Sequence, residues 1–195
     1  MTRLLGAVTL ALLGFMAAAT HRRALALRTA DVPSPHTFVP SPALGRALTV
    51  GENELAADLV WIRSLIYYGD GITRNTGLPD VDRLVALINH LDPWFRRPYL
   101  WGAHAVTYRK QKPTQEEFES SIEVLRRGVA IFPRDWELSW LLGLRLAFDL
   151  KPKDPALSRA AREEGAGFLE KAMRVPGAPS DLPLLAASLR TRLGQ

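Results

Sequence analysis

The stretch that decides the fold runs from Phe95 to Trp136 and reads FRRPYLWGAHAVTYRKQKPTQEEFESSIEVLRRGVAIFPRDW. Apolar residues recur in it at helical spacing, and a Lys-Pro step interrupts them near the middle. This pattern predicts two antiparallel helices and the start of a third. We expect the second helix over residues 114–132, because Thr114 begins a capping box and a proline follows the last apolar residue.

The second helix carries a pattern of small residues that returns further along the chain. Its members are Ser121, Leu125, Gly128 and the closing Pro133. Small residues at such positions let one helix approach its neighbour closely, and the proline ends the unit. The second half of the pattern recurs at Gly165, Leu169 and Ala172. We therefore expect a fold built from a repeated helix pair.

The rest of the chain predicts further helices and no strand. Helices are expected over residues 43–50, 53–68, 81–91, 95–110, 135–148 and 155–174, with a last one after Pro179. An open loop is expected from Gly69 to Pro79, because Gly69 and Gly71 follow the helix. Two apolar stripes on the helix at 53–68 predict that it is buried on most sides. The expected fold class is all-α, with seven or eight helices.

The first 28 residues are predicted to be a signal peptide or a signal-anchor helix. Leu4 to Ala19 is a run without charge, intermediate in length between a signal-peptide apolar region and a membrane-spanning helix. The three alanines at its end offer a cleavage site, whereas Arg22 and Arg23 suit a retained anchor, so both alternatives stay open. In a bacterial protein, a retained anchor faces the domain toward the periplasm, and cleavage releases it there.

A tether and one domain are expected after this segment. Residues 29–42 contain four prolines, which favour an extended tether over a packed element, and residues 43–195 would form the domain. Of the net charge of +5, residues 1–31 carry +3 and the rest only +2, which disfavours a nucleic-acid-binding surface. The chain has no cysteine, which excludes disulfides and thiolate metal sites.

The repeated unit resembles the tetratricopeptide repeat (TPR), whose first helix carries a Trp, a Leu-Gly step and a Tyr. The matching positions are Trp61, Tyr68, Trp101-Gly102 and Leu142-Gly143. The resemblance covers about residues 53–176 and implies a TPR-like stack of about three helix pairs plus a capping helix, after an N-terminal hydrophobic helix. The two glycines are 41 residues apart, against about 34 in the family, so the loops are longer. The start of the domain, with Ala57-Asp58-Leu59-Val60-Trp61 after a signal-like segment, also resembles exported bacterial TPR-like proteins, which implies no activity.

The resemblance also implies a binding surface. In TPR-like stacks the first helices line a concave groove that takes a peptide or a helix of a partner. With Gly102 and Gly143 as registers, the groove positions are Arg96, Tyr99, Glu137 and Trp140. Aromatic residues and Arg carry much of the energy at protein interfaces. The alternative is that Tyr99 and Trp140 pack against the next repeat.

Ionisable residues among the apolar stripes offer a second, enzymatic interpretation. Asp58 shares a stripe with Trp61, and we expect a buried structural acid there rather than a ligand-facing one. His90, Asp92 and His104 can meet across a helix hairpin, but they have no known metal-ligand spacing, so no metal and no cofactor are expected.

We expect a membrane-tethered or periplasmic interaction scaffold, an adaptor or assembly factor, rather than an enzyme. Its partner would be a protein, with no nucleic acid and no small-molecule substrate. One alternative is a small helical hydrolase that uses Asp58, Asp92 or His104. The other is a purely structural subunit of an envelope complex.

Overall fold

The computed structural model describes residues 38–74, 76–108, 112–180 and 182–193, together with residues 14, 16 and 18–20. The chain divides into two compact units, residues 1–37 and 38–195. Most of the predicted signal or anchor segment and of the tether lies outside the described residues. No helix in the described part of the chain is both long enough and apolar enough to span a membrane.

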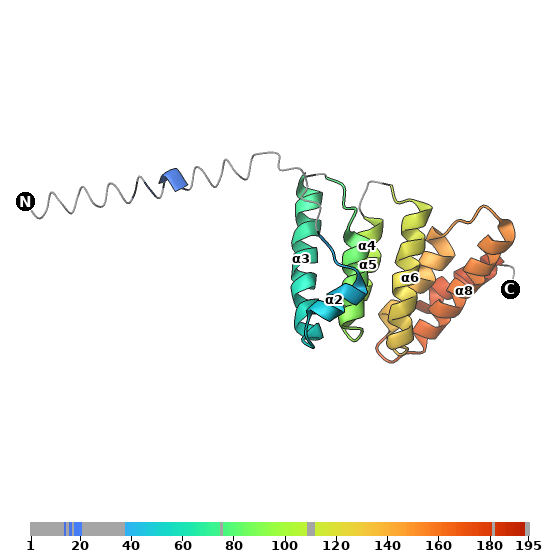
Figure 1. Cartoon of the computed structure of the whole chain (residues 1–195). Helices are drawn as coiled ribbons and strands as arrows, with labels where there is room; N and C mark the ends of the chain where they lie inside the picture. The colour runs from blue at the N-terminus through green and yellow to red at the C-terminus, as the bar shows by residue number, and fades with distance from the viewer. Residues whose placement is uncertain are drawn as a thin grey trace, which may run out of the picture. The chain divides into compact units, whose positions relative to one another are not determined.

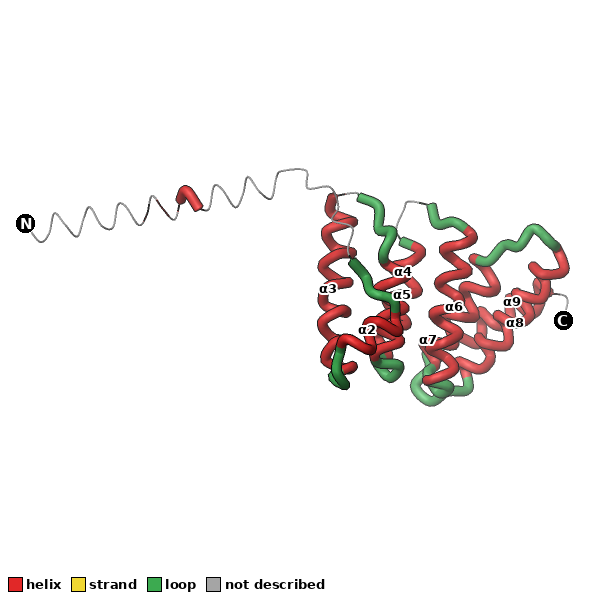
Figure 2. Tube along the Cα trace, in the orientation of Figure 1, coloured by secondary structure: helices red, strands yellow, loops and turns green. Residues whose placement is uncertain are grey.

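The second unit is all-α in its described residues, as the sequence predicts, and contains no strand there (Figure 2). Its helices are α2 (Pro42–Leu48), α3 (Asn53–Arg74), α4 (Val81–Leu91), α5 (Arg96–Thr107), α6 (Gln115–Ile131), α7 (Trp136–Leu144), α8 (Pro155–Met173) and α9 (Leu182–Leu193). A short π-helix, η1 (Arg145–Asp149), continues α7. The chain therefore reaches its fold through short connections between successive helices.

These helices form a row in which each one from α3 onward packs mainly on the helix before it and the helix after it (Figure 1). The short helix α2 packs on α4. The apolar core is consequently distributed along the row. One cluster joins α5, α6 and α7 around Tyr99 and Leu125, and another joins α3 and α4 around Ala57 and Ile88.

Local capping signals place the helix starts where the sequence predicts them. The Thr114 side chain accepts a hydrogen bond from the Glu117 backbone at 3.2 Å, and the Glu117 carboxylate accepts one from the Thr114 backbone at 2.8 Å. Asp135 and Asp154 cap α7 and α8 through their carboxylates, which accept hydrogen bonds from backbone N–H groups of the first turn. Each of these bonds satisfies a backbone N–H that the helix itself leaves unpaired.

Glycines mark the closest approach between neighbouring helices. A Cβ atom at Gly165 of α8 would lie 2.8 Å from the carbonyl oxygen of Gly143 in α7, and one at Gly128 of α6 would lie 3.1 Å from the Tyr99 side chain. A larger residue at Gly165 would therefore press on the backbone of α7, and one at Gly128 would displace the Tyr99 side chain.

Helix α3 differs from its prediction in length. It continues through Gly69 and Gly71 to Arg74, where the sequence predicted an open loop. Gly71 is a contact site rather than a break in the helix, because a Cβ atom there would overlap a methyl carbon of Leu78.

The prediction that α3 is buried on most sides is wrong. Its buried residues are Ala57, Ser64 and Gly71 alone among those described, whereas the apolar stripe on its opposite side is exposed. The reason is position: α3 stands at the end of the row of described helices, so α4 covers one side of it only.

Two further boundaries differ from expectation. The expected helix 135–148 is an α-helix only to Leu144, and the backbone then widens into η1. At the N-terminal side of the domain, the second compact unit begins at Phe38, whereas the sequence predicted a start at Ala43. Val39 is buried there, and its carbonyl oxygen accepts a 2.7 Å hydrogen bond from Arg83.

Candidate functional site

A hollow of about 530 Å³ opens between α5, α7 and the segment that leads into α9. Its lining is mainly aromatic and aliphatic: Leu100, Trp101 and His104 from α5, Trp136, Glu137, Trp140, Leu141 and Leu144 from α7, and Pro179 and Leu182. Three half-buried tryptophans thus border one open concavity. An apolar concave surface with a few polar groups is typical of a binding site.

The aromatic lining continues from the hollow toward α3. The Trp101 ring packs edge-on against Trp61 at 5.0 Å and against Tyr68 at 5.5 Å, and Trp61 in turn meets Phe95 at 5.7 Å between centroids. Such edge-to-face contacts hold large side chains in fixed orientations. Helices α3, α5 and α7 therefore contribute to one aromatic face.

His104 is the ionisable group on the α5 side of the hollow. Its ring stacks on Tyr108 at 6.2 Å between centroids. The surrounding protein removes part of its hydration and Arg145 adds a positive charge nearby, and together they lower the pKa of His104 despite the opposing effect of Glu137. The imidazole is therefore held toward its neutral form.

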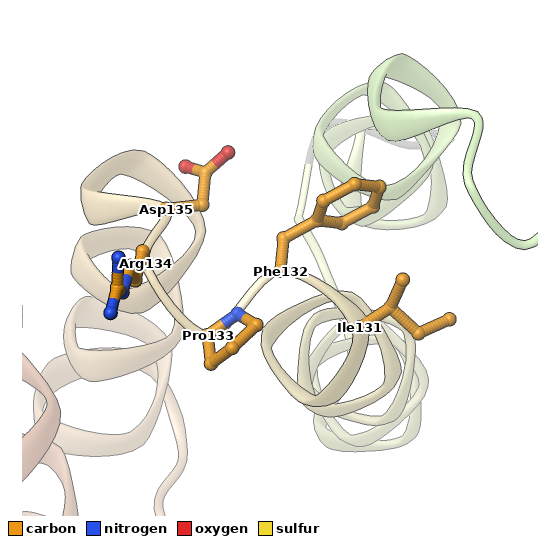
Figure 3. A pocket seen from close by; sticks show the side chains of 5 residues that line it. All are labelled: Ile131, Phe132, Pro133, Arg134 and Asp135. Carbon is orange, nitrogen blue, oxygen red and sulfur yellow. The ribbon is translucent and has the colours of Figure 1, made fainter.

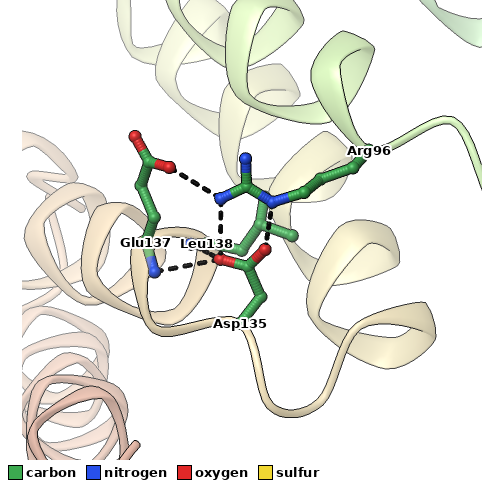
Figure 4. A network of polar contacts seen from close by, with 4 residues as sticks. All are labelled: Arg96, Asp135, Glu137 and Leu138. Carbon is green, nitrogen blue, oxygen red and sulfur yellow. Dashed lines mark hydrogen bonds and ion pairs between the residues drawn. The ribbon is translucent and has the colours of Figure 1, made fainter. Parts of the chain in front are cut away.

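An ion-pair network ties the start of α5 to the start of α7 (Figure 4). The Arg96 guanidinium donates to both carboxylate oxygens of Asp135 and, at 2.6 Å, to Glu137. The same Asp135 accepts hydrogen bonds from the backbone N–H groups of Glu137 and Leu138 at 3.0 and 3.1 Å. One carboxylate thus caps α7 and fixes its distance from α5.

The network also sets the charge states of its members. Partial burial opposes ionisation of Asp135, but the hydrogen bonds from Arg96 and from the two backbone N–H groups outweigh it and lower the pKa of Asp135. The bond to Asp135 is the largest cause that raises the pKa of Arg96. Both groups are therefore charged across the neutral range.

The structure places the four predicted groove residues in different surroundings. Trp140 lines the hollow and also packs against the apolar cluster around Leu169. Glu137 lines the hollow too, while Arg96 lies in the ion-pair network beside it. Tyr99 is a core residue instead, 1% exposed, with its hydroxyl donating to the Pro93 carbonyl at 3.0 Å.

The sequence prediction missed Trp101, Trp136 and His104 as residues of the hollow. Helix α5 turns Trp101 and His104 toward the hollow and Tyr99 toward α6, where Tyr99 meets Gly128. The spacing of three residues from Trp101 to His104 places both on one side of the helix. That spacing was a signal in the sequence, but the groove positions that were assigned relative to Gly102 did not include Trp101 and His104.

Asp58 corrects a further prediction, because it is exposed rather than buried. Asp92 accepts a hydrogen bond from the Trp94 backbone at 2.9 Å and shapes the turn before α5. In the part of the chain that the structure describes, no hydrogen bond or ion pair joins Asp58, Asp92 and His104, and no group of three or more His, Asp or Glu side chains is placed to hold a metal ion.

A second hollow, of about 390 Å³, lies beside the turn between α6 and α7 (Figure 3). Ile131, Phe132, Pro133, Arg134 and Asp135 line it. The Phe132 ring points to a different side from the Asp135 carboxylate, which is committed to Arg96 and to the cap of α7. These contacts give the turn a structural role, in capping α7 and in linking it to α5.

Comparisons with family models, with curated proteins and with solved structures found no match for this chain.

Proposed function

We propose that the chain is a TPR-like scaffold that binds a partner protein in the hollow between α5, α7 and α9. The pairs α3/α4, α5/α6 and α7/α8 correspond to the three repeat units, and α9 corresponds to the capping helix. The pairwise packing along the row supports this assignment, since in a repeat protein each unit contacts only its neighbours. The proposed role involves no catalytic step.

The single observation that carries the proposal is the hollow bordered by Trp101, Trp136 and Trp140. A binding site on the first helices of consecutive units is what a TPR-like stack would present. The volume of the hollow, about 530 Å³, lies within the range of about 300–1,000 Å³ that is typical of ligand pockets. Tryptophan is also one of the residue types that are enriched among those that dominate interface energy.

The ion-pair network supports the same role. Arg96, Asp135 and Glu137 hold α5 and α7 at one separation, next to the hollow that these helices border. A site kept in shape before binding loses less free energy on ordering when the partner arrives. The cell envelope is the proposed location, on the basis of the charge and hydropathy of residues 1–31.

Trp140→Ala tests the proposal, with Trp94→Ala as its matched control. Both change the same residue type, but Trp94 is 73% exposed in the turn before α5 and lies outside the hollow. The full chain would be used to capture partners from membrane extracts, and the captured partner would then be titrated against each variant. We expect Trp140→Ala to weaken binding by about 2 kcal/mol or more, and Trp94→Ala to leave it unchanged.

Melting curves of the two variants decide how a loss is interpreted. If Trp140 serves mainly as core, Trp140→Ala should cost about 3–5 kcal/mol of stability, and binding would fail because the domain unfolds. That result, or equal binding by the two variants, would count against the hollow as the site.

A further inference from the structure

The outward side of α3 carries four large apolar residues without cover in the described structure. They are Leu55, Leu59, Ile62 and Ile66, which we call the α3 stripe, and each is more than half exposed. Their spacing of four, three and four residues is that of alternating a and d positions in a heptad. Ala57, Ser64 and Gly71, spaced by seven, are buried on the other side and occupy the f position of the same heptad.

This geometry leaves α3 as one half of a coiled-coil seam. The f position lies opposite a and d, so the body of the domain stands behind the helix and does not obstruct its stripe. Trp61 takes position c, on a different side from the stripe. The hollow between α5 and α7 would therefore stay open if another helix packed on the stripe.

We propose that the occupant of the α3 stripe is the α3 helix of a second copy of this chain, in a parallel and in-register pair. The charges beside the stripe favour this choice. Asp58 falls at position g and Arg63 at position e of the following heptad, and both are exposed. Neither has an ion-pair partner among the described residues. In a parallel pair, position g of one helix faces position e of the next heptad on the other, so Asp58 meets Arg63 of the second copy twice by symmetry.

An antiparallel pair lacks this match. Position g then faces g, which sets Asp58 beside Leu65 of the second copy and leaves Arg63 without an acidic neighbour. Opposite charges at g and e mainly select the orientation of a pair, whereas the apolar positions supply its stability.

Two other occupants fit the charges less well. A helix that lies on a lipid surface has a polar face rich in Lys and Arg, but α3 carries three acidic residues against two arginines. The apolar run at Leu4–Ala19 of the same chain has no charged residue to meet Asp58 or Arg63. A second copy supplies both complements.

Oligomeric state tests the seam directly. The full chain, purified in mild detergent, would be examined by light scattering and sedimentation across a range of protein concentrations. We expect a dimer that Ile62→Asp converts to a monomer, because a carboxylate at position d would be buried without a partner. Leu157→Asp is the matched control, because Leu157 on α8 has a similar exposure, 59% against 52%. We expect this control to remain dimeric, and circular dichroism would verify that both variants are folded.

Crosslinking tests the orientation, and the absence of native cysteine makes it specific. A single Ile62→Cys change should give a disulfide-linked dimer under mild oxidation, since equal d positions meet in a parallel pair. Leu157→Cys should give none. In an antiparallel pair residue 62 meets residue 59 instead, so a mixture of Leu59→Cys and Ile62→Cys chains would crosslink while Ile62→Cys alone would not.

The charges give a third, reversible test. Asp58→Arg and Arg63→Asp should each weaken the dimer by roughly threefold to tenfold, and the double exchange should restore it. Recovery in the double variant is a result that a lipid surface or an unrelated protein would not produce.

Several outcomes would overturn the proposal. These are a monomeric wild-type chain at all concentrations, a dimer that Ile62→Asp leaves intact, or no recovery in the charge exchange. A crosslink within one chain between Leu12→Cys and Ile62→Cys would assign the stripe to the chain's own N-terminal segment. Protection of the Ile62→Cys thiol from a water-soluble maleimide by phosphatidylcholine vesicles, in a monomeric chain, would assign it to lipid.

Discussion

Helices α3 and α6 have similar apolar sequence patterns but differ in how far those apolar residues are buried. Both present large apolar residues at helical spacing, yet Ile122, Leu125 and Val129 of α6 are buried, whereas the α3 stripe is exposed. Helix α6 stands between α5 and α7, and α3 has a neighbour on one side only. An apolar stripe therefore predicts a surface that can be buried, and the position of the helix in the row decides whether another described helix buries it.

The largest expected effect contrasts one leucine from each helix. Leu125→Ala should cost about 2–5 kcal/mol of unfolding free energy, because Leu125 is 0% exposed and the change leaves a cavity in the core. Leu59→Ala should stay within about 0.5 kcal/mol at low protein concentration, because Leu59 already faces solvent.

Urea unfolding of the two variants at several protein concentrations checks this contrast. If the loss of unfolding free energy in Leu59→Ala grows with protein concentration, it reflects a weaker dimer rather than a less stable fold. Equal losses at low concentration would mean that α3 is covered within the monomer, which would break the comparison.

The next effect uses two glycines of α8. Gly165→Ala should destabilise the domain by about 1–3 kcal/mol, because the new Cβ would press on the Gly143 carbonyl oxygen and on the Ala147 backbone. Gly167→Ala, two residues later on the same helix, should stabilise it by about 0.5–1 kcal/mol, because nothing lies within 4 Å of a Cβ there. Thermal melts of both variants measure the contrast, and shifts of the same sign would refute the close packing of α7 on α8.

The smallest effect concerns the ion-pair network and depends on pH. Asp135→Asn should cost about 1–2 kcal/mol at pH 7, because it removes the charge that Arg96 binds. Because folding lowers the pKa of Asp135 below the ordinary 3.8, its stabilisation is full above that value and is lost as the pH falls through the lowered pKa. The difference between wild type and Asp135→Asn should therefore shrink on acidification.

Asp154→Asn is the control for this experiment. Asp154 also caps a helix, through a 2.8 Å bond from the Ala156 backbone, and asparagine caps about as well as aspartate. Denaturation at pH 7 and at successively lower pH would compare the two. A penalty in Asp135→Asn that does not change with pH would show that the ion pair contributes nothing measurable.

The sequence by itself determined where most helices begin. Thr114, Asp135 and Asp154 cap the backbone within three residues of themselves, so their effect needs no distant partner. It also indicated that Gly128 and Gly165 are sites of close helix contact, because a glycine at a recurring position of an apolar face has few other uses.

Only the tertiary structure decided which aromatic residues are core and which border the hollow. Tyr99 and Trp101 are two residues apart on α5, and one is buried against α6 while the other lines the hollow. Successive residues differ by about 100° around a helix, so Tyr99 and Trp101 face nearly opposite sides, and the rotation of α5 about its own axis decides which of them meets α6. That rotation is set by contacts with α4 and α6, such as Gly102 on Val85 and Gly128 on Tyr99, which come from residues distant in the chain.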